Sequence, residues 1–350
     1  MTPSGPTPTL MLSRRKLMGT AIGLGAVCAL PGLSAVAQSA GSINDRMTGD
    51  LVPVHDPCII KQGDTYHLFS TGHVYDAQGL LPWRTSKDLV TWTYQRPAMA
   101  ALPDWAEEAV PGTQGTWAPD IAFFNGRYHL YYSLSTFGSN RSVIGLITTP
   151  TLDVSDPAFA WTDHGIVHAS RVASDYNAID SNIIAGSDGR YWMSLGSFWT
   201  GIKIMEIDPA TGKPKPDARV TGIASRRNPG AVEAPYIIER DGWYYLFASF
   251  DACCRGVEST YFTVVGRSRS ATGPYVDRDG RRMMQGGGFL VLHADLDDSG
   301  RFKGPGHVAI LRDPNRDYIV HHAYDSRADG APTLRIQPLA WTDDGWPVAV

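Results

Sequence analysis

The chain has 350 residues and a formal net charge of −4 at neutral pH, with no basic stripe, which argues against nucleic acid as a partner. Gly (36 residues) and aromatic side chains (10%) are abundant. This composition is typical of an all-β protein with many tight turns and is far from that of a disordered chain.

The first 37 residues predict a cleavable export signal. The basic segment Arg14-Arg15-Lys16 precedes an apolar stretch, and Ala35-Val36-Ala37 follows as a cleavage site. The paired arginines indicate the twin-arginine type, with an ordinary secretory signal as the alternative. The apolar stretch contains several Gly and a Pro and is short for a membrane span, so we expect no stable membrane association. A periplasmic or extracellular protein, residues 38–350, is the expected product.

Three cysteines remain after cleavage, namely Cys58, Cys253 and Cys254. An odd number in an exported protein does not form a complete disulfide framework. The adjacent pair Cys253-Cys254 either forms a disulfide between neighbours or stays as two thiols. No spacing between Cys and His residues matches a zinc site.

One pattern recurs five times along residues 38–350: a turn residue, a Tyr, and then an apolar or alternating strand. The copies lie at 63–70, 126–133, 189–196, 242–249 and, in weaker form, 316–324. Each copy follows a short apolar run and a turn with Asn, Asp or Gly, which is typical of a β-hairpin. No stretch combines a sustained 3.6-residue period with capping residues, so we expect almost no helix.

The repeated Tyr residues are 53 to 74 positions apart. Radial repetition of such multi-stranded units predicts an all-β, single-domain, five-bladed β-propeller over residues 38–350. The alternative is a two-sheet jelly roll, in which the strands would not recur as five similar hairpins.

Each hairpin is preceded by one ionisable residue, 8 to 11 positions before its Tyr. In a propeller the first strand of every blade lines the central channel, so these side chains are expected to meet there. Gathering carboxyls in one cavity perturbs their pKa values, which favours a functional site over a purely structural one. A single such residue would be explained as the start of a strand, and Asp120 is the one most readily explained this way. The five residues are Asp56, Asp120, Asp180, Glu233 and His307.

Two convergent carboxyl groups of unequal pKa are what hydrolysis of a glycosidic bond requires. One stays ionised and activates water, while the other stays protonated and donates to the leaving oxygen. A third carboxylate nearby helps the acid to keep its proton by repulsion and orients it.

Several motifs, in this order, closely resemble those of the arabinanases of glycoside hydrolase family 43. The match spans nearly all of the chain after the signal, and the ordered set is far more specific than any one motif. The motifs are HDP (55–57), WAPDI (117–121), AIDSN (178–182), EAPY (233–236), STYFTVVGRSRSATGPY (259–275) and GPGH (304–307).

The resemblance implies a five-bladed propeller that hydrolyses with inversion of configuration. By motif match, Asp56 is the expected general base, Glu233 the general acid, and Asp180 the carboxylate that tunes the pKa of the acid and orients it. An inverting reaction predicts that the carboxyl groups of Asp56 and Glu233 lie about 6.5–9.5 Å apart.

The resemblance also implies a metal ion on the axis, usually calcium, with His307 as its protein ligand. Calcium prefers six to eight oxygen ligands, so water would have to complete the shell. The alternative for His307 is a packed, hydrogen-bonded histidine of the channel.

Sugar binding would use aromatic faces and polar groups near the axis. Blade packing is the competing explanation for the aromatic residues, and the sequence leaves open whether His55 orients Asp56 or lines the sugar pocket. The CCRG segment (253–256) resembles a loop of the family and is expected on the same face. The candidate substrate-binding residues are His55, Trp117, Phe137, Asn140, Asn182, Ser197 and Trp199.

The resemblance therefore implies an endo-1,5-α-L-arabinanase whose substrate is the arabinan of pectin. The signal segment predicts that it is exported, and we expect it to be a monomer. The first alternative is an exo-acting α-L-arabinofuranosidase or β-xylosidase of the same family. Many of these carry a β-sandwich after the propeller, for which this chain leaves no room before Val350. The second is a non-catalytic carbohydrate-binding propeller, which would keep the aromatic residues and lose a carboxylate.

Overall fold

The structure is a computed structural model that describes residues 42–227, 230–314 and 316–350. The predicted export signal, residues 1–37, lies outside the described residues. Helical segments are few and short, which confirms the expectation of almost no helix. They are α1 (Ile43–Arg46), α2 (Ala106–Ala109) and the 3-10 turns η1 (Gly256–Glu258), η2 (Met283–Gln285) and η3 (Ala294–Leu296).

The strands form five sheets in chain order, one for each predicted repeat. The first sheet has the order β1-β6-β5-β3-β2 and the second β10-β9-β8-β7-β4. The strands of the first sheet are β1 (Thr48–Gly49), β2 (Cys58–Gln62), β3 (Thr65–Phe69), β5 (Leu80–Ser86) and β6 (Thr91–Met99). Those of the second are β4 (Gly72–His73), β7 (Gly115–Phe124), β8 (Arg127–Leu134), β9 (Ser142–Thr149) and β10 (Thr162–Ser170).

The third sheet has the order β11-β12-β13-β14, with β15 also paired to β13, and the last two sheets are simple meanders. The strands of the third sheet are β11 (Asn182–Ala185), β12 (Tyr191–Leu195), β13 (Ile202–Asp208), β14 (Lys213–Pro214) and β15 (Thr221–Ala224). Those of the fourth are β16 (Val232–Arg240), β17 (Trp243–Phe250), β18 (Phe262–Ser268) and β19 (Phe289–Leu292). Those of the fifth are β20 (Phe302–Asp313), β21 (Arg316–Asp325), β22 (Ala331–Trp341) and β23 (Pro347–Ala349).

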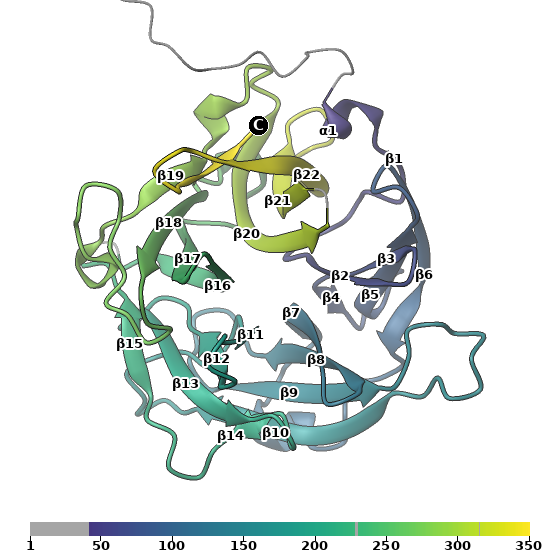
Figure 1. Ribbon diagram of the computed structural model, residues 1–350. Coiled ribbons are helices and arrows are strands. Elements are labelled where there is room, and N and C mark those ends of the chain that lie inside the picture. Colours follow the sequence, from purple (N-terminus) through teal and green to yellow (C-terminus); the bar gives the residue numbers. More distant parts are fainter. Residues whose placement is uncertain (1–41, 228–229, 315) are drawn as a thin grey trace, which may run out of the picture. The chain divides into compact units, whose positions relative to one another are not determined.

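The innermost strands of the five sheets surround one axis (Figure 1). Each inner strand contacts the next in the order β2, β7, β11, β16 and β20. Because β20 also contacts β2, the inner ring is closed. All five predicted hairpins are present as β2–β3, β7–β8, β11–β12, β16–β17 and β20–β21. The five-bladed propeller is therefore confirmed, and the jelly roll is excluded.

The segment before the first blade closes the ring against the last one. The Val54 N–H donates to the Pro332 carbonyl (2.9 Å), and the Leu334 N–H donates to the Leu51 carbonyl (3.0 Å). The Asn44 side chain in α1 accepts the N–H of Ile336 (2.9 Å). Hydrogen bonds thus join the segment before the first blade to the fifth blade and close the ring.

Apolar side chains fill the space between neighbouring blades. Each of the five hydrophobic clusters contains residues from two adjacent sheets, for example Trp83 of the first with Leu130 of the second. Trp92 and Trp346 are examples of buried aromatic side chains, at 1% and 2% exposed. Burying each such side chain contributes about 1.5–3 kcal/mol, so the interfaces between blades hold the ring rigid around its axis.

The starts of the inner strands share an uncommon backbone conformation. Asp56, Asp180 and His307 have φ angles of 51°, 58° and 51°, and Ala118 and Ala234 have 44° and 53°. The pairing registers of β7, β16 and β20 shift near these positions, which marks β-bulges. Left-handed backbone costs a non-glycine residue roughly 1–2 kcal/mol, and bulges turn side chains in new directions. Every blade carries this strain at the same end, which is typical of a functional site.

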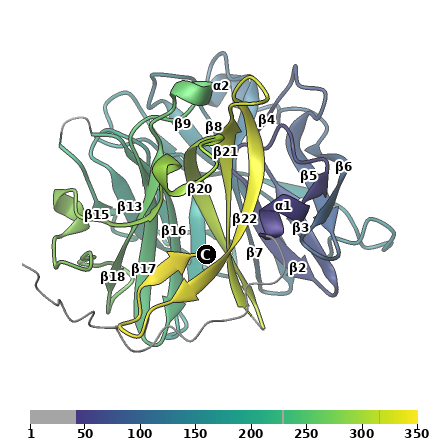
Figure 2. The same ribbon diagram turned by 90° about the horizontal axis from the view of Figure 1, so that it is seen from above.

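The ionisable residues of the repeat therefore lie at one end of the sheets. Figure 2 shows the propeller from the side, with the sheets standing along its axis and α2 at one end. Hairpin turns such as Asp241–Gly242 lie at the opposite end of the inner strands, because each hairpin runs from the start of its first strand to the turn.

Candidate active site

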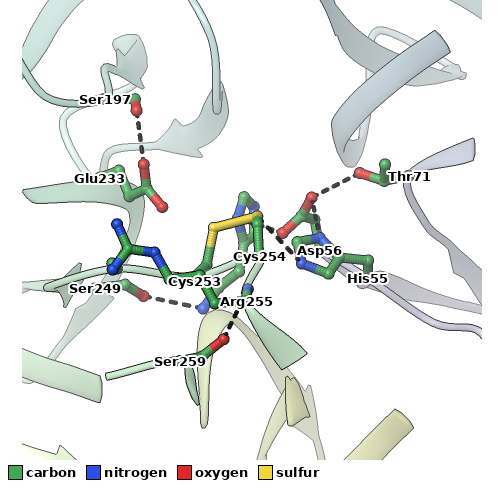
Figure 3. Close-up of a disulfide and its surroundings, with 12 residues drawn as sticks. His55, Asp56, Thr71, Ser197, Glu233, Ser249, Cys253, Cys254, Arg255 and Ser259 are labelled. Atoms are coloured by element: carbon green, nitrogen blue, oxygen red, sulfur yellow. Dashed lines mark hydrogen bonds and ion pairs between the residues drawn. A yellow bond between two sulfur atoms is a disulfide. The ribbon is translucent and has the colours of Figure 1, made fainter. Parts of the chain in front are cut away.

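The structure brings Asp56, Asp180, Glu233 and His307 together on four inner strands or directly before them. Asp56 and Asp180 precede β2 and β11, Glu233 lies at the start of β16, and His307 lies in β20. The three carboxylate residues are only 6–8% exposed, so their charges interact with little screening by water. Figure 3 shows Asp56 and Glu233 on either side of a disulfide.

Asp56 lies among hydrogen-bond donors. Its Oδ2 accepts the Thr71 hydroxyl (2.7 Å) and forms an ion pair with His55 Nδ1 (2.7 Å). Its Oδ1 lies 3.0 Å from His307 Nδ1. Burial by itself raises the pKa of Asp56, but the charges and hydrogen bonds of His55 and His307 outweigh it and hold the pKa well below its usual range. Asp56 is therefore ionised at neutral pH, as a general base must be.

His55 is held on three sides. Besides the ion pair with Asp56, its Nε2 lies 2.8 Å from the Tyr324 hydroxyl, and its ring stacks on His322 with 3.9 Å between ring centroids. His322 Nδ1 in turn accepts the backbone N–H of Asp56 (3.1 Å). Of the two interpretations that the sequence left open for His55, these contacts favour the one in which it orients Asp56.

Glu233 has very different surroundings. The Ser197 hydroxyl donates to its Oε2 (2.6 Å). Burial raises the pKa of Glu233 above its ordinary value. Hydrogen bonds from Ser197 and Tyr261 and the charge of His307 lower it, and the charge of Asp56 raises it, but burial prevails. A carboxyl that keeps its proton in this way can act as a general acid.

Asp180 interacts with both of the other carboxylates. Burial, together with the negative charges of Glu233 and Asp56, raises the pKa of Asp180 to about 8. Its Oδ2 accepts the N–H of Ala234, the residue after Glu233 (3.2 Å), and its own N–H donates to the Ser133 hydroxyl (3.1 Å). Asp180 thereby contacts the backbone that carries Glu233.

His307 is the candidate metal ligand, and its contacts fit one metal bond at most. Its Nδ1 faces Asp56, which leaves Nε2 to be taken by a proton or by a metal ion. Burial lowers the pKa of His307, but the carboxylates, Asp56 foremost, reverse this and raise it to about 9. Within the described residues, His307 belongs to no group of three or more ligating side chains that would form a cage.

Asp120, the fifth residue of the pattern, has an internal role. Its Oδ2 accepts the N–H of Ile183 (2.8 Å) and its Oδ1 the side-chain amide of Asn182 (3.4 Å). Both contacts cross from the second blade to the third. Burial raises the pKa of Asp120 to about 7. The structural explanation that the sequence favoured for this residue agrees with these contacts.

The predicted aromatic residues differ in exposure. Phe137 is 79% exposed and lies 5.1 Å from Trp117, measured between ring centroids. Trp199 is 42% exposed and follows Ser197 by two positions, in a loop where Phe198 and Trp199 both have positive φ. These three side chains therefore have faces that a sugar chain can reach.

Two of the predicted polar contacts are engaged elsewhere. The Asn140 amide donates to the carbonyls of Ser174 (2.8 Å) and Tyr176 (3.3 Å). The Asn182 amide accepts the N–H of Ile237 (2.8 Å) and donates to Asp120. Both residues are buried, so we assign them to bracing loops and blades rather than to the sugar. The Ser197 hydroxyl donates a hydrogen bond to Glu233.

Sequence reasoning missed the side chains on the second strands of the hairpins. Antiparallel pairing places the end of each second strand opposite the start of the first, as in Glu233 with Ser249 and Gly306 with His322. Counting this register back from each turn would have pointed to Thr71, His322 and Tyr324. Ser249 likewise accepts the N–H of His307 (2.9 Å).

The adjacent cysteines, whose state the sequence left open, form a disulfide. Cys254 Sγ lies 3.8 Å from His55 Nε2, which places the disulfide at the site (Figure 3). Cys58 is a buried free thiol.

In the part of the chain that the structure describes, no helix is both long and apolar enough to span a membrane.

Known proteins resemble this chain over most of its length. Extracellular endo-α-(1→5)-L-arabinanase 1 of Bacillus subtilis (strain 168) is 42% identical over 298 residues, which are 84% of this chain and 87% of that one. Extracellular exo-α-(1→5)-L-arabinofuranosidase ArbA of Cellvibrio japonicus (strain Ueda107) is 41% identical over 308 residues, 85% of this chain and 86% of that one. The structure of Cellvibrio cellulosa α-L-arabinanase complexed with arabinohexaose superposes with a TM-score of 0.79 at 38% identity, covering 86% of this chain and 96% of that one.

The model of one protein family, glycosyl hydrolases family 43, matches residues 52–347, which include every blade. The resemblance inferred from the ordered motifs is thus confirmed, and the chain belongs to glycosyl hydrolase family 43.

Proposed function

We propose that this protein is an endo-1,5-α-L-arabinanase that cleaves internal α-1,5-L-arabinofuranosidic bonds of arabinan with inversion. The contrast between an ionised Asp56 and a Glu233 that keeps its proton carries the proposal, because hydrolysis needs one carboxyl in each state. Relatives named for action on α-(1→5)-linked arabinan provide the substrate class.

In the proposed reaction Asp56 takes a proton from a water molecule while the water oxygen forms a bond to the anomeric carbon. Glu233 gives its proton to the glycosidic oxygen as the old carbon–oxygen bond breaks. Asp180 interacts electrostatically with Glu233 and accepts the N–H of Ala234, the next residue, so we assign to it the tuning and orientation of the acid. Proton exchange with solvent then returns both catalytic carboxyls to their starting states. Inversion predicts a separation of about 6.5–9.5 Å between the two carboxyls.

We propose that Trp117, Phe137 and Trp199 contact the sugar chain. Their exposed faces support this role, since aromatic rings suit the C–H faces of sugars. An aromatic-to-Ala change at Phe137, the most exposed of the three, is expected to raise KM more than it lowers kcat.

Product analysis on linear arabinan tests the proposal. An endo enzyme lowers viscosity early and releases a mixture of oligomers, and proton NMR of the first products shows the anomer opposite to that of the substrate. The exo alternative, supported by the 41% identical exo-acting relative, predicts one short product and a slow fall in viscosity. Action only on an aryl arabinofuranoside, or on xylan alone, would contradict the proposal. A binding propeller would show no turnover on any of these substrates.

We further propose that His307 offers Nε2 to a metal ion, with calcium suggested by the family resemblance. The His307–Asp56 contact supports this, because a carboxylate on one ring nitrogen commonly accompanies a metal on the other. Such an ion, held by this one side chain and by water, would add positive charge on the axis. Elemental analysis of the purified protein tests the proposal, and His307→Gln is expected to lose the metal.

We also propose that the protein is exported through its twin-arginine signal and acts as a monomer without membrane association. The extracellular names of two relatives support export. Replacing Arg14 and Arg15 with Lys should keep the enzyme in the cytoplasmic fraction, while light scattering of the mature protein should give the mass of one chain.

A further inference from the structure

The loop between β17 and β18 lies over the site and carries the Cys253–Cys254 disulfide (Figure 3). Its base is fixed, because the Asp251 N–H donates to the Ala231 carbonyl (3.2 Å) and the Asp251 carboxylate forms an ion pair with Arg226 (2.6 Å). The Thr260 N–H also donates to the Ala252 carbonyl (3.0 Å). The disulfide is therefore presented by a braced loop rather than by a free one.

One contact of this loop leads directly to the base. The Cys254 N–H donates to the Tyr324 hydroxyl (2.8 Å), and that hydroxyl lies 2.8 Å from His55 Nε2. On its other side the His55 ring forms the 2.7 Å ion pair with Asp56. A continuous set of polar contacts thus runs from the peptide of the disulfide to the carboxylate.

We propose that the disulfide loop and Tyr324 form a brace that holds the His55 imidazole against Asp56, so that Tyr324 is a positioning residue for this carboxylate. The inference rests on the proposed function, in which Asp56 is the base. It assigns a role to Tyr324 and to the cysteines, which the hydrolytic step itself does not use.

The chemistry of the pair explains why a disulfide suits this place. A bond between neighbouring cysteines closes a small ring that includes the peptide between them, so it restricts the direction of the Cys254 N–H. Cys254 also has a φ of 65°, a conformation that a non-glycine residue adopts only where its surroundings hold it. Tyr324 is thereby anchored by the loop, and the His55 ring that it contacts is also stacked on His322. Small shifts of a catalytic group can cost about 100-fold in rate, so this rigidity matters for turnover.

Steady-state kinetics on linear arabinan test the brace. Tyr324→Phe removes only the hydroxyl and is expected to lower kcat about 10- to 100-fold with KM changed less than about threefold. The double change Cys253→Ser with Cys254→Ser is expected to lower kcat about 3- to 10-fold. Because both act through one contact, the triple variant should be no slower than Tyr324→Phe by more than about twofold.

Two controls separate positioning from stability. Tyr245→Phe removes another tyrosine hydroxyl bond, to the Gly345 carbonyl (2.6 Å), away from the site, and is expected to keep kcat. Reduction of the wild-type enzyme by a phosphine should reproduce the effect of the cysteine change, and the Cys253→Ser/Cys254→Ser variant should not respond to it. This reduction also carries the test if Tyr324→Phe fails to fold.

The brace would be overturned by a Tyr324→Phe enzyme with wild-type kcat, or by cysteine and tyrosine effects that multiply. A cysteine variant with raised KM and unchanged kcat would instead make the disulfide a surface that touches the sugar. Failure of the proposed function is seen separately, as a wild-type enzyme without activity on arabinan. In that case the nitrogen-15 NMR signals of His55, identified with His55→Gln, still decide: they should shift in Tyr324→Phe and after reduction but not in Tyr245→Phe.

Discussion

Asp56 and Glu233 are both buried near the start of an inner strand, but their pKa values are shifted in opposite directions. The Asp56 carboxylate accepts a hydrogen bond from the Thr71 hydroxyl and faces the imidazoles of His55 and His307. The Glu233 carboxylate accepts a hydrogen bond from the Ser197 hydroxyl. The pKa falls in the first case and rises in the second.

Burial acts in the same direction on both groups, since it raises the pKa of any carboxyl. The difference therefore comes from the partners of each carboxyl, which for Asp56 include the neighbouring His55 as well as residues of another blade. Blade 5 supplies His307 to Asp56, whereas Glu233 finds its donor on blade 3. The roles of base and acid are thus set by what the propeller brings to each carboxyl.

The largest expected effect comes from removing each carboxyl in turn. Asp56→Ala and Glu233→Ala should each lower kcat on linear arabinan about 10²–10⁴-fold, because each removes one proton transfer. On an arabinofuranoside with a dinitrophenolate leaving group, Glu233→Ala should recover most of its rate, since that group leaves without a proton. Asp56→Ala should recover nothing. Equal recovery of both variants would contradict the assignment of the two roles.

The next effect tests the donors around the base. Thr71→Val keeps the shape of the side chain but removes the hydroxyl that donates to Asp56 and accepts the Ala118 N–H (2.8 Å). A buried N–H without its acceptor costs about 1–3 kcal/mol, so the free energy of unfolding in urea should fall by that amount. We expect kcat to fall about tenfold, and Thr71→Ser, which keeps the hydroxyl, should restore most of it. Loss of stability with unchanged kcat would remove Thr71 from the support of the base.

The donor to the acid gives a smaller effect with a defined sign. The Ser197 hydroxyl stabilises the ionised form of Glu233, so Ser197→Ala should raise the pKa of Glu233 further. The acid then loses its proton at higher pH, and the basic limb of the profile of kcat against pH should move upward. Ser197→Thr should keep the limb in place. A shift to lower pH would mean that the Ser197 bond favours the protonated carboxyl.

Much of this architecture was accessible from the sequence because it rests on local patterns. Five copies of turn, Tyr and strand predict five hairpins, and radial closure follows from their number. The ionisable residues could be placed at one end because each occurs at a similar distance, 8 to 11 positions, before the Tyr of its hairpin. Register counted back from each turn places Thr71, His322 and Tyr324 near the site, but their individual contacts depend on the bulges, which no single stretch of sequence specifies.

The uses of the polar side chains were harder to predict for the same reason. Asn140 and Asn182 look available in sequence, but packing buries both amides among backbone groups of neighbouring segments. The disulfide depends on whether the loop holds the two cysteines in a bonded geometry, which residue identity alone leaves open. Asp180 and Asp120 are the same residue type at similar places in the repeat, and only their contacts in the folded protein distinguish their roles.

Asp120 provides the smallest effect on activity and the sharpest test of whether a raised pKa by itself makes an acid catalyst. Its pKa of about 7 is raised by burial, as for Glu233, yet its oxygens bind Ile183 and Asn182. Asp120→Asn keeps an oxygen for the Ile183 N–H, so kcat should stay within about threefold of the wild type. Glu233→Gln, the matched change at the proposed acid, should lose most of its activity on arabinan.

The change that Asp120→Asn causes in the free energy of unfolding should depend on pH. From about pH 4 to about pH 7 the folded protein keeps a proton on Asp120 that the unfolded chain has released, so this group makes the wild type less stable as pH rises. The Asn side chain does not titrate, and the free energy of unfolding of the variant should therefore gain on that of the wild type across this range. Urea unfolding of both proteins at several pH values measures the difference. A constant difference would mean that the folded protein and the unfolded chain release the Asp120 proton at the same pH, so that burial does not raise the pKa of Asp120.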